Sequence, residues 1–143
     1  GPLKPVMTLK SHVSQVRDFP AGASVSYGRT FKGDKPFTTA VVLAGYADGY
    51  PRRLSNNTTV TINGVRYPQA GRICMDMCMI DVTDLPQVKS GDEVEIFGEH
   101  VLCADLAERC DTIPYELLCA VSKRVPRHYF LHGERVDADL QSV

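Results

Sequence analysis

The stretch TVTINGVRY, residues 59–67, decides the fold of this chain. It places Asn-Gly, a pair that readily accepts the positive φ values of a type I′ turn, between two runs of β-branched and aromatic residues. A two-residue turn fixes the register, so Ile62 should pair with Val65 and Val60 with Tyr67 on one apolar face. The intervening residues should point the other way. The stretch therefore predicts a β-hairpin with one face in a core.

The same kind of pattern extends over most of the chain. From Met7 to Gly98, turn-forming residues recur about every eight to twelve positions between β-branched or aromatic runs, which is typical of an all-β barrel or sandwich. The continuous apolar run Phe37–Gly45 predicts a strand covered on both faces. Arg72–Val82 and Glu93–Phe97 predict two further strands. The expected fold is mainly β.

Three methionines sit at alternate positions in the strand expected over Arg72–Val82. Alternation would place Met75, Met77 and Met79 on one side of that strand. Cys74 and Cys78 would share the other side, about 13 Å apart, too far for a bridge or a shared metal.

Helix is indicated only late in the sequence. Cys103–Cys110 has helical composition, and Thr112 could cap a second helix with Pro114 in its first turn. The apolar stripe of that helix, at helical spacing, comprises Leu117, Leu118, Val121 and Val125. A short strand through Tyr129 is expected after Pro126.

Composition restricts the function classes. The 143 residues, 43% hydrophobic and 23% charged, suit one globular domain. Sixteen basic and seventeen acidic residues leave a formal net charge of -1 without a basic block, which argues against a nucleic-acid partner. The longest apolar stretch, around Ala40–Ala44, is far short of a membrane span, so we expect a soluble domain.

We expect the chain to divide into three parts. Residues 1–3, beginning Gly1-Pro2, resemble the remnant of a removed tag. Residues 4–131 should form the folded domain, and residues 132–143 a flexible tail. The five cysteines are an odd number without a CxxC motif, so we expect reduced thiols and no metal site.

Five short motifs concentrate residues with special chemistry or shape. They are SYG at 26–28, GYADGYPR at 45–52, GRICMDM at 71–77, IPYE at 113–116 and SKRVPR at 122–127. Each alone has a structural explanation: Asp48-Gly49 suits a turn, and Asp76 could cap a turn or pair with Arg72. Single motifs therefore carry little weight.

Together and in this order, the motifs resemble the carboxy-terminal domain of alanine racemases, from about Lys10 to Phe130. The resemblance implies a Greek-key-like β-barrel with one or two short helices near the C-terminus. It also implies a cytoplasmic parent enzyme that interconverts L- and D-alanine for peptidoglycan synthesis. In that family an amino-terminal α/β barrel holds pyridoxal 5'-phosphate on a lysine, which would lie outside this chain. The parent would be a homodimer in which this domain completes the partner's active site.

The resemblance assigns roles to individual residues. Tyr27 matches the tyrosine that acts as one of the two catalytic bases. Met75 matches the residue whose backbone N–H binds the substrate carboxylate, and Asp76 matches an acidic neighbour that would orient that site. Tyr115 matches the tyrosine that donates a hydrogen bond to the cofactor phosphate. The residues that match a narrow access corridor for a small amino acid are Tyr46, Arg52, Arg72 and Ile113.

Two alternatives remain at this point. The domain could belong to a racemase for serine or for several amino acids, although a tyrosine at position 115 favours alanine. It could also be a noncatalytic β-barrel interaction module. Under the leading hypothesis, this chain alone should be inactive because the lysine-bearing barrel is missing.

Overall fold

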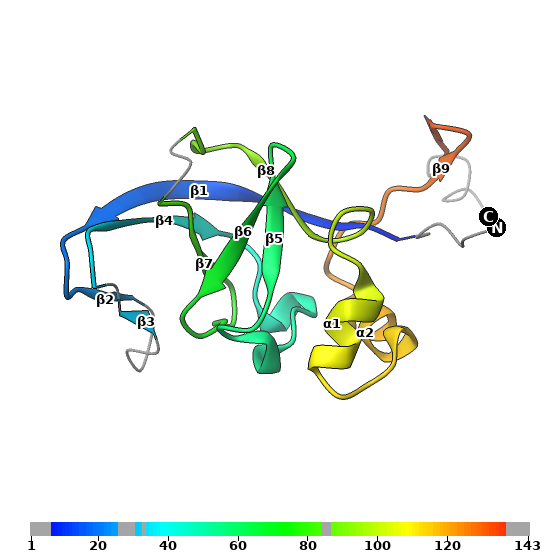
Figure 1. The fold of residues 1–143 in the computed structure, drawn as a ribbon. Helices are drawn as coiled ribbons and strands as arrows, with labels where there is room; N and C mark the ends of the chain where they lie inside the picture. Colours follow the sequence, from blue (N-terminus) through cyan, green and yellow to red (C-terminus); the bar gives the residue numbers. More distant parts are fainter. Residues whose placement is uncertain (1–6, 26–30, 33, 84–86, 137–143) are drawn as a thin grey trace.

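The computed structural model describes residues 7–25, 31–32, 34–83 and 87–136. Its centre is an antiparallel barrel of six strands in the order β1-β4-β7-β6-β5-β8, with β8 pairing back onto β1 (Figure 1). The barrel strands are β1 (Leu9–Phe19), β4 (Phe37–Val42), β5 (Thr59–Ile62), β6 (Val65–Ala70), β7 (Cys78–Asp81) and β8 (Glu93–Phe97). The prediction of a mainly β barrel is confirmed.

The strand order contains a Greek key. β5, β6 and β7 follow one another as an antiparallel meander, and β4 returns to lie beside β7. The strand β1 closes the barrel by pairing with two neighbours along its length, with β8 through Leu9–His12 and with β4 through Val13–Phe19.

The hairpin of residues 59–67 forms in the predicted register. Val60 pairs with Tyr67 and Ile62 with Val65 across β5 and β6. Asn63 and Gly64 have φ values of 54° and 77°, as a type I′ turn requires. Val60 and Ile62 are completely buried, so the predicted apolar face does belong to the core.

Two other predicted strands form, one with the predicted bounds and one that is shorter. β8 spans the predicted residues Glu93–Phe97, whereas β4 ends at Val42 rather than at Gly45. β4 lies between β1 and β7, and five of its six residues are buried, as a strand covered on both faces should be. The chain turns out of the sheet at Leu43, which is exposed.

The prediction of one strand over Arg72–Val82 was wrong. β7 begins only at Cys78, because residues 71–77 form an irregular loop in which the Cys74 N–H donates to the Met77 carbonyl oxygen at 2.9 Å. Met75 and Met77 are consequently exposed rather than aligned along a strand. Cys74 and Cys78 do not share a strand, so the expected 13 Å separation does not apply.

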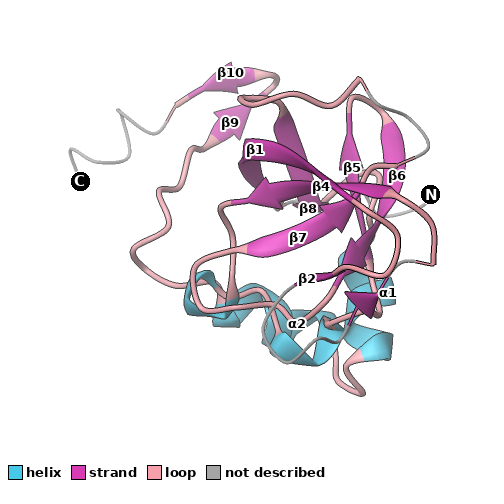
Figure 2. Ribbon diagram, turned by 90° about the vertical axis from the view of Figure 1, so that its left-hand side faces the viewer, coloured by secondary structure: helices cyan, strands magenta, loops and turns pink. Residues whose placement is uncertain are grey.

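Two short helices, α1 (Cys103–Arg109) and α2 (Pro114–Ala120), lie together at one end of the barrel (Figures 1 and 2). The predicted cap at Thr112 was wrong: Ile113 is the N-cap, and Pro114 opens the helix at its first position. Of the predicted stripe, Leu117 and Val121 are buried, and Leu118 and Val125 pack against the core from its margin. Val121 and Val125 follow the end of α2.

The remaining elements are short. They are β2 (Ser24–Val25), β3 (Phe31–Lys32), β9 (Phe130–Leu131), β10 (Glu134–Arg135) and the 3₁₀ helices η1 (Tyr46–Asp48) and η2 (Arg52–Leu54). A flexible tail was expected from His132, but β9 and β10 pair as a hairpin through His132 and Gly133, both at positive φ. Residues 137–143 of that tail lie outside the described residues.

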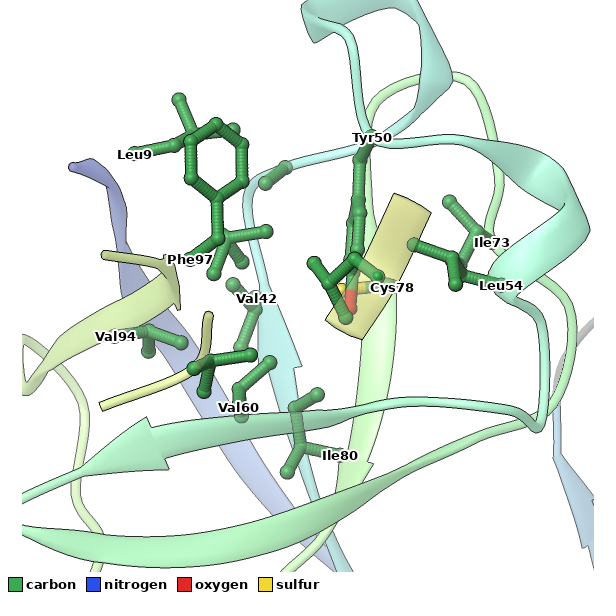
Figure 3. Close-up of a cluster of buried hydrophobic side chains, with 14 of the residues drawn as sticks. Leu9, Val42, Tyr50, Leu54, Val60, Ile73, Cys78, Ile80, Val94 and Phe97 are labelled. Carbon is green, nitrogen blue, oxygen red and sulfur yellow. The ribbon is translucent and has the colours of Figure 1, made fainter. Parts of the chain in front are cut away.

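The core fills the barrel interior and continues toward the helices. Val42, Val60, Ile80 and Val94 enter it from four different strands, while Leu54 enters from η2 and Tyr50 and Ile73 enter from loops at the helical end (Figure 3). The helical end is therefore bound to the barrel by continuous apolar packing. Its segments carry the GYADGYPR, GRICMDM and IPYE motifs, whereas SYG lies outside the described residues.

Candidate active site

The loop of residues 71–77 is held against η1 by backbone contacts. The N–H groups of Tyr46 and Ala47 donate to the carbonyl oxygens of Cys74 and Met75 at 2.9 and 3.0 Å. The approach is so close that a β-carbon on Gly45 would lie 2.3 Å from the Cys74 carbonyl oxygen, which excludes any residue but glycine there. The GYADGYPR and GRICMDM motifs thus form one packed unit.

Among the described residues, no group accepts a hydrogen bond from the backbone N–H of Met75, and Met75 is 53% exposed. The flanking carbonyl groups of Cys74 and Met75 are both engaged by η1, so the peptide is held while its donor stays open. Such a fixed donor suits an oxygen atom of a small ligand.

Asp76 is joined to η1 through Arg124. The Arg124 Nη2 atom lies 3.3 Å from Asp76 Oδ1 and 3.2 Å from Asp48 Oδ1. Both carboxylates raise the pKa of the Arg124 guanidinium, and the hydrogen bond to Asp76 has the largest effect. Arg124 lies in the SKRVPR motif but was not among the predicted site residues, and Arg72 was the predicted alternative partner of Asp76.

Asp48 connects the same unit to the end of α2. Its Oδ2 atom accepts the Gly45 N–H at 3.1 Å, and its carbonyl oxygen accepts the Ser122 N–H at 3.2 Å. Gly49, at a φ of 106°, lies against the backbone of Val121, where a β-carbon would be 2.6 Å from the Val121 Cα atom. η1, the loop of residues 71–77 and the exit of α2 are therefore fixed relative to one another.

η2 attaches to the same loop on its other side. The Ser55 hydroxyl donates to the Arg52 carbonyl oxygen at 2.7 Å and accepts the Ile73 N–H at 2.8 Å. Arg53 donates to the Cys110 carbonyl oxygen at the end of α1 at 2.9 Å. Arg52 itself is exposed and Arg72 is half-buried. Three of the four predicted corridor residues, Tyr46, Arg52 and Arg72, thus lie on mutually bonded segments.

Ile113 and Tyr115 lie at the far end of α2 from its contact with η1. Seven helical residues span about 10 Å, so these side chains stand one short helix away from the Met75 loop. Both are exposed, Tyr115 to 71%. Cys119, one helical turn further on, raises the pKa of the Tyr115 hydroxyl, which therefore remains a protonated hydrogen-bond donor at neutral pH.

Tyr27 lies outside the described residues. The backbones of β2 and β3 pair on either side of it in the sequence, Ser24 with Lys32 and Val25 with Phe31. The predicted site is thus brought together in part: Tyr46, Met75 and Asp76 lie in one bonded unit with the unpredicted Asp48 and Arg124.

Within the described residues, no group of three or more His, Cys, Asp or Glu side chains could hold a metal ion. The five cysteines are free, with Cys78 and Cys110 buried and Cys119 exposed. None of the helices described is long and apolar enough to cross a membrane.

Comparison with known proteins identifies the family. The family model described as "Alanine racemase, C-terminal domain" matches residues 6–129, nearly the whole chain. The chain belongs to this family. The chain is 51% identical over 138 residues to alanine racemase 1 of Clostridium acetobutylicum, and the match covers 94% of this chain and 36% of that protein.

Solved structures agree with the domain assignment. An alanine racemase of Clostridium difficile 630 in complex with cycloserine matches with a TM-score of 0.88 and 39% identity, over 94% of this chain and 36% of that one. The alanine racemase of Bartonella henselae with covalently bound pyridoxal phosphate matches with a TM-score of 0.83 and 40% identity, over 86% and 34%. The chain therefore spans about a third of the length of the relatives that it matches.

Proposed function

We propose that the enzyme containing this domain interconverts L- and D-alanine and that the domain supplies part of the active site of a partner subunit. The proposal is supported by the similarity to alanine racemases over the whole domain. The structural observation that carries it is the open N–H of Met75 on a loop fixed by η1. A racemase needs such a donor to hold the substrate carboxylate while Cα changes configuration.

Racemisation requires one base on each face of Cα, one to remove a proton and one to return it. We assign one base to Tyr27, on the strength of the SYG motif and the family resemblance. A phenol has a reference pKa of about 10, so the assembled site must provide cationic or hydrogen-bonding neighbours that favour the phenolate. The amine of a lysine outside this chain would serve the opposite face.

The substrate carboxylate would accept the Met75 N–H. Because the donor belongs to the backbone, the role is independent of the thioether, and the methionine side chain is free to line the corridor. Asp76 would orient the loop rather than act as a base, since it is paired with Arg124. Tyr46, Arg52, Arg72 and Ile113 would line the access corridor and exclude bulky amino acids.

Pyridoxal 5'-phosphate, when bound, takes up the carbanion charge that develops on the substrate. On this chain Tyr115 fits the group: its hydroxyl is exposed and protonated, and it can donate to a phosphate oxygen. The covalent attachment would come from the amino-terminal barrel of the same enzyme. We place the enzyme in the cytoplasm as a homodimer that supplies D-alanine for peptidoglycan.

Racemisation assays of the full-length enzyme test this function. We expect turnover of L- and D-alanine, and we expect Tyr27→Ala to impair proton abstraction from L-alanine more than from D-alanine. Tyr129→Ala, which removes an exposed tyrosine outside the candidate site, is the control and should retain activity. A strong preference for serine would replace the substrate assignment. Proton abstraction is measured as exchange of the Cα proton of each enantiomer with solvent deuterium, because kcat/KM must fall equally in both directions when the equilibrium constant is unity. Equal losses of the two exchange rates would reject the role of Tyr27.

A further inference from the structure

A charged cluster adjoins the N–H of Met75, and two of its members, Asp48 and Arg124, have no functional role so far. It consists of Asp48, Asp76 and Arg124, with one guanidinium nitrogen within 3.3 Å of an oxygen of each carboxylate. Asp76 directly follows Met75 in the chain, and its side chain is 63% exposed. An anion bound to the Met75 N–H would therefore lie close to two carboxylates.

The guanidinium of Arg124 offsets the repulsion between a bound anion and these two carboxylates. Two carboxylates and one guanidinium carry a net charge of -1, whereas the carboxylates alone would carry -2. Water screens exposed charges, but neighbours within a few ångströms still act on a bound anion. The guanidinium keeps its charge at all physiological pH values.

Arg124 also joins three segments. It links Asp76 in the loop of residues 71–77 to Asp48 in η1, and it lies two residues after Ser122, whose N–H donates to the Asp48 carbonyl oxygen. Exposed ion pairs contribute little to stability, because water screens them and two long side chains must be ordered. Stability alone is therefore a weak reason for this three-way contact beside an open donor.

We propose that Arg124 is a positioning residue for the substrate carboxylate, because its guanidinium offsets the negative charge of Asp48 and Asp76 beside the Met75 N–H. The proposal rests on the proposed function, because it takes the ligand of Met75 to be a carboxylate. It assigns to the SKRVPR motif a part in substrate affinity rather than in the proton transfers. The proposal predicts that loss of Arg124 changes the KM for alanine and the affinity for anions, with little change in kcat.

The test uses the full-length enzyme with alanine as substrate and acetate, which has a carboxylate and no amine, as a competing anion. Arg124→Gln should raise both the KM for alanine and the inhibition constant of acetate roughly three- to tenfold, with kcat changed less than twofold. Arg124→Lys should recover part of both effects. Lys123→Gln removes the same charge one residue earlier, from an exposed position, and should leave both values within twofold.

Asp48→Asn tests the direction in which acetate affinity changes. The amide oxygen of the substituted side chain can still accept the Gly45 N–H. The net charge of the cluster changes from -1 to zero, so acetate should bind more tightly than it does to the unmodified enzyme. A purely structural role would instead make Asp48→Asn and Arg124→Gln weaken acetate binding alike, and that result overturns the proposal. If Arg124→Gln does not fold, Asp48→Asn alone still tests the proposal, because weaker binding of acetate to that variant rejects the role of Arg124.

The two hypotheses fail in different ways. If the unmodified enzyme does not racemise alanine, the proposed function is wrong. If it does, and Arg124→Gln leaves the KM and the acetate inhibition constant unchanged, only the role of Arg124 is rejected.

Discussion

A β-carbon on Gly45 would lie 2.3 Å from the carbonyl oxygen of Cys74. The backbone at Gly45 is extended, with a φ of -147°, so any residue could adopt its conformation. Glycine is required there only because the loop of residues 71–77 packs directly on it. Two motifs separated by some twenty residues are thus joined at a single point.

Gly45→Ala should destabilise this 143-residue chain by about 1–3 kcal/mol through steric overlap, as other overpacked interiors do. Urea unfolding followed by circular dichroism measures the loss. Gly22→Ala is the matched control: it strains a positive φ of 85° but meets no atom within 4 Å. A smaller loss for Gly45→Ala than for Gly22→Ala would contradict the packing described here.

The buried thiol of Cys78 predicts a loss of stability at alkaline pH. Burial, with a smaller effect of Cys74, raises its pKa from 9.0 to about 12. Above pH 9 the thiol ionises in the unfolded chain but not in the folded one, so folding stability is complete below pH 9 and declines toward pH 12. The slope for one proton is about 1.4 kcal/mol per pH unit.

Comparison of two variants isolates this effect. Cys78→Ala should flatten the decline of unfolding free energy between pH 9 and 12 relative to the unmodified chain. Ile96→Val shortens another completely buried side chain that has no ionisable group, and it should leave the slope unchanged. Identical slopes for both variants would show that Cys78 ionises in the folded protein.

Glu95 predicts the opposite dependence in acid. Burial acts to raise its pKa, but hydrogen bonds from the Val101 N–H and from His100 outweigh this and lower the pKa below 4.5. Its contribution to stability is therefore present above pH 4.5 and is lost as the pH falls through the lowered value. Glu95→Gln should cost about 1–3 kcal/mol at pH 7, since two backbone donors lose a charged acceptor.

The measurement for Glu95 is urea unfolding at pH 7 and at pH 3. The difference between Glu95→Gln and the unmodified chain should shrink in acid. Glu93→Gln, at an exposed surface pair with Lys10, is the control and should have little effect at either pH. A Glu95→Gln cost that is independent of pH would argue against an ionised Glu95.

Tyr115→Phe in the full-length enzyme should weaken retention of pyridoxal phosphate about tenfold, the consequence of removing one hydrogen bond to a charged group. Equilibrium dialysis followed by cofactor absorbance measures this. Tyr129→Phe removes another exposed tyrosine hydroxyl and should retain normal affinity. Equal affinities for both variants would remove Tyr115 from the cofactor site.

The 143-residue chain on its own should neither racemise alanine nor bind pyridoxal phosphate tightly. The reason is that the cofactor lysine is expected in an amino-terminal domain, and the relatives are nearly three times as long as the region that matches. Absorbance titration with the cofactor and an alanine assay check both points. A saturable spectral change with turnover would refute this division of roles.

Local patterns sufficed where the physics is local. The Asn63-Gly64 turn determined its hairpin and register because positive φ values and β-branched flanks are encoded within nine residues. The start of α2 was harder to predict: Thr112 is a good capping residue, but the helix begins at Pro114, one residue later than that cap would require.

Long-range contacts explain what the sequence did not reveal. Residues 72–77 alternate like a strand, but hydrogen bonds from η1 hold Cys74 and Met75 in a loop instead. Arg124 could not be assigned because its partners, Asp48 and Asp76, are 76 and 48 residues away. The roles of Met75, Tyr115 and the corridor residues came from the family resemblance, since spacing alone does not distinguish a site from a turn.

One strand, β1, belongs to both halves of the barrel, because Leu9–His12 pair with β8 and Val13–Phe19 pair with β4. A shortened version of the domain that started after Phe19 would leave two strand edges bare, and bare edges recruit strands from other molecules. Expression boundaries and proteolytic trimming should therefore be placed upstream of Leu9, or the product will tend to aggregate.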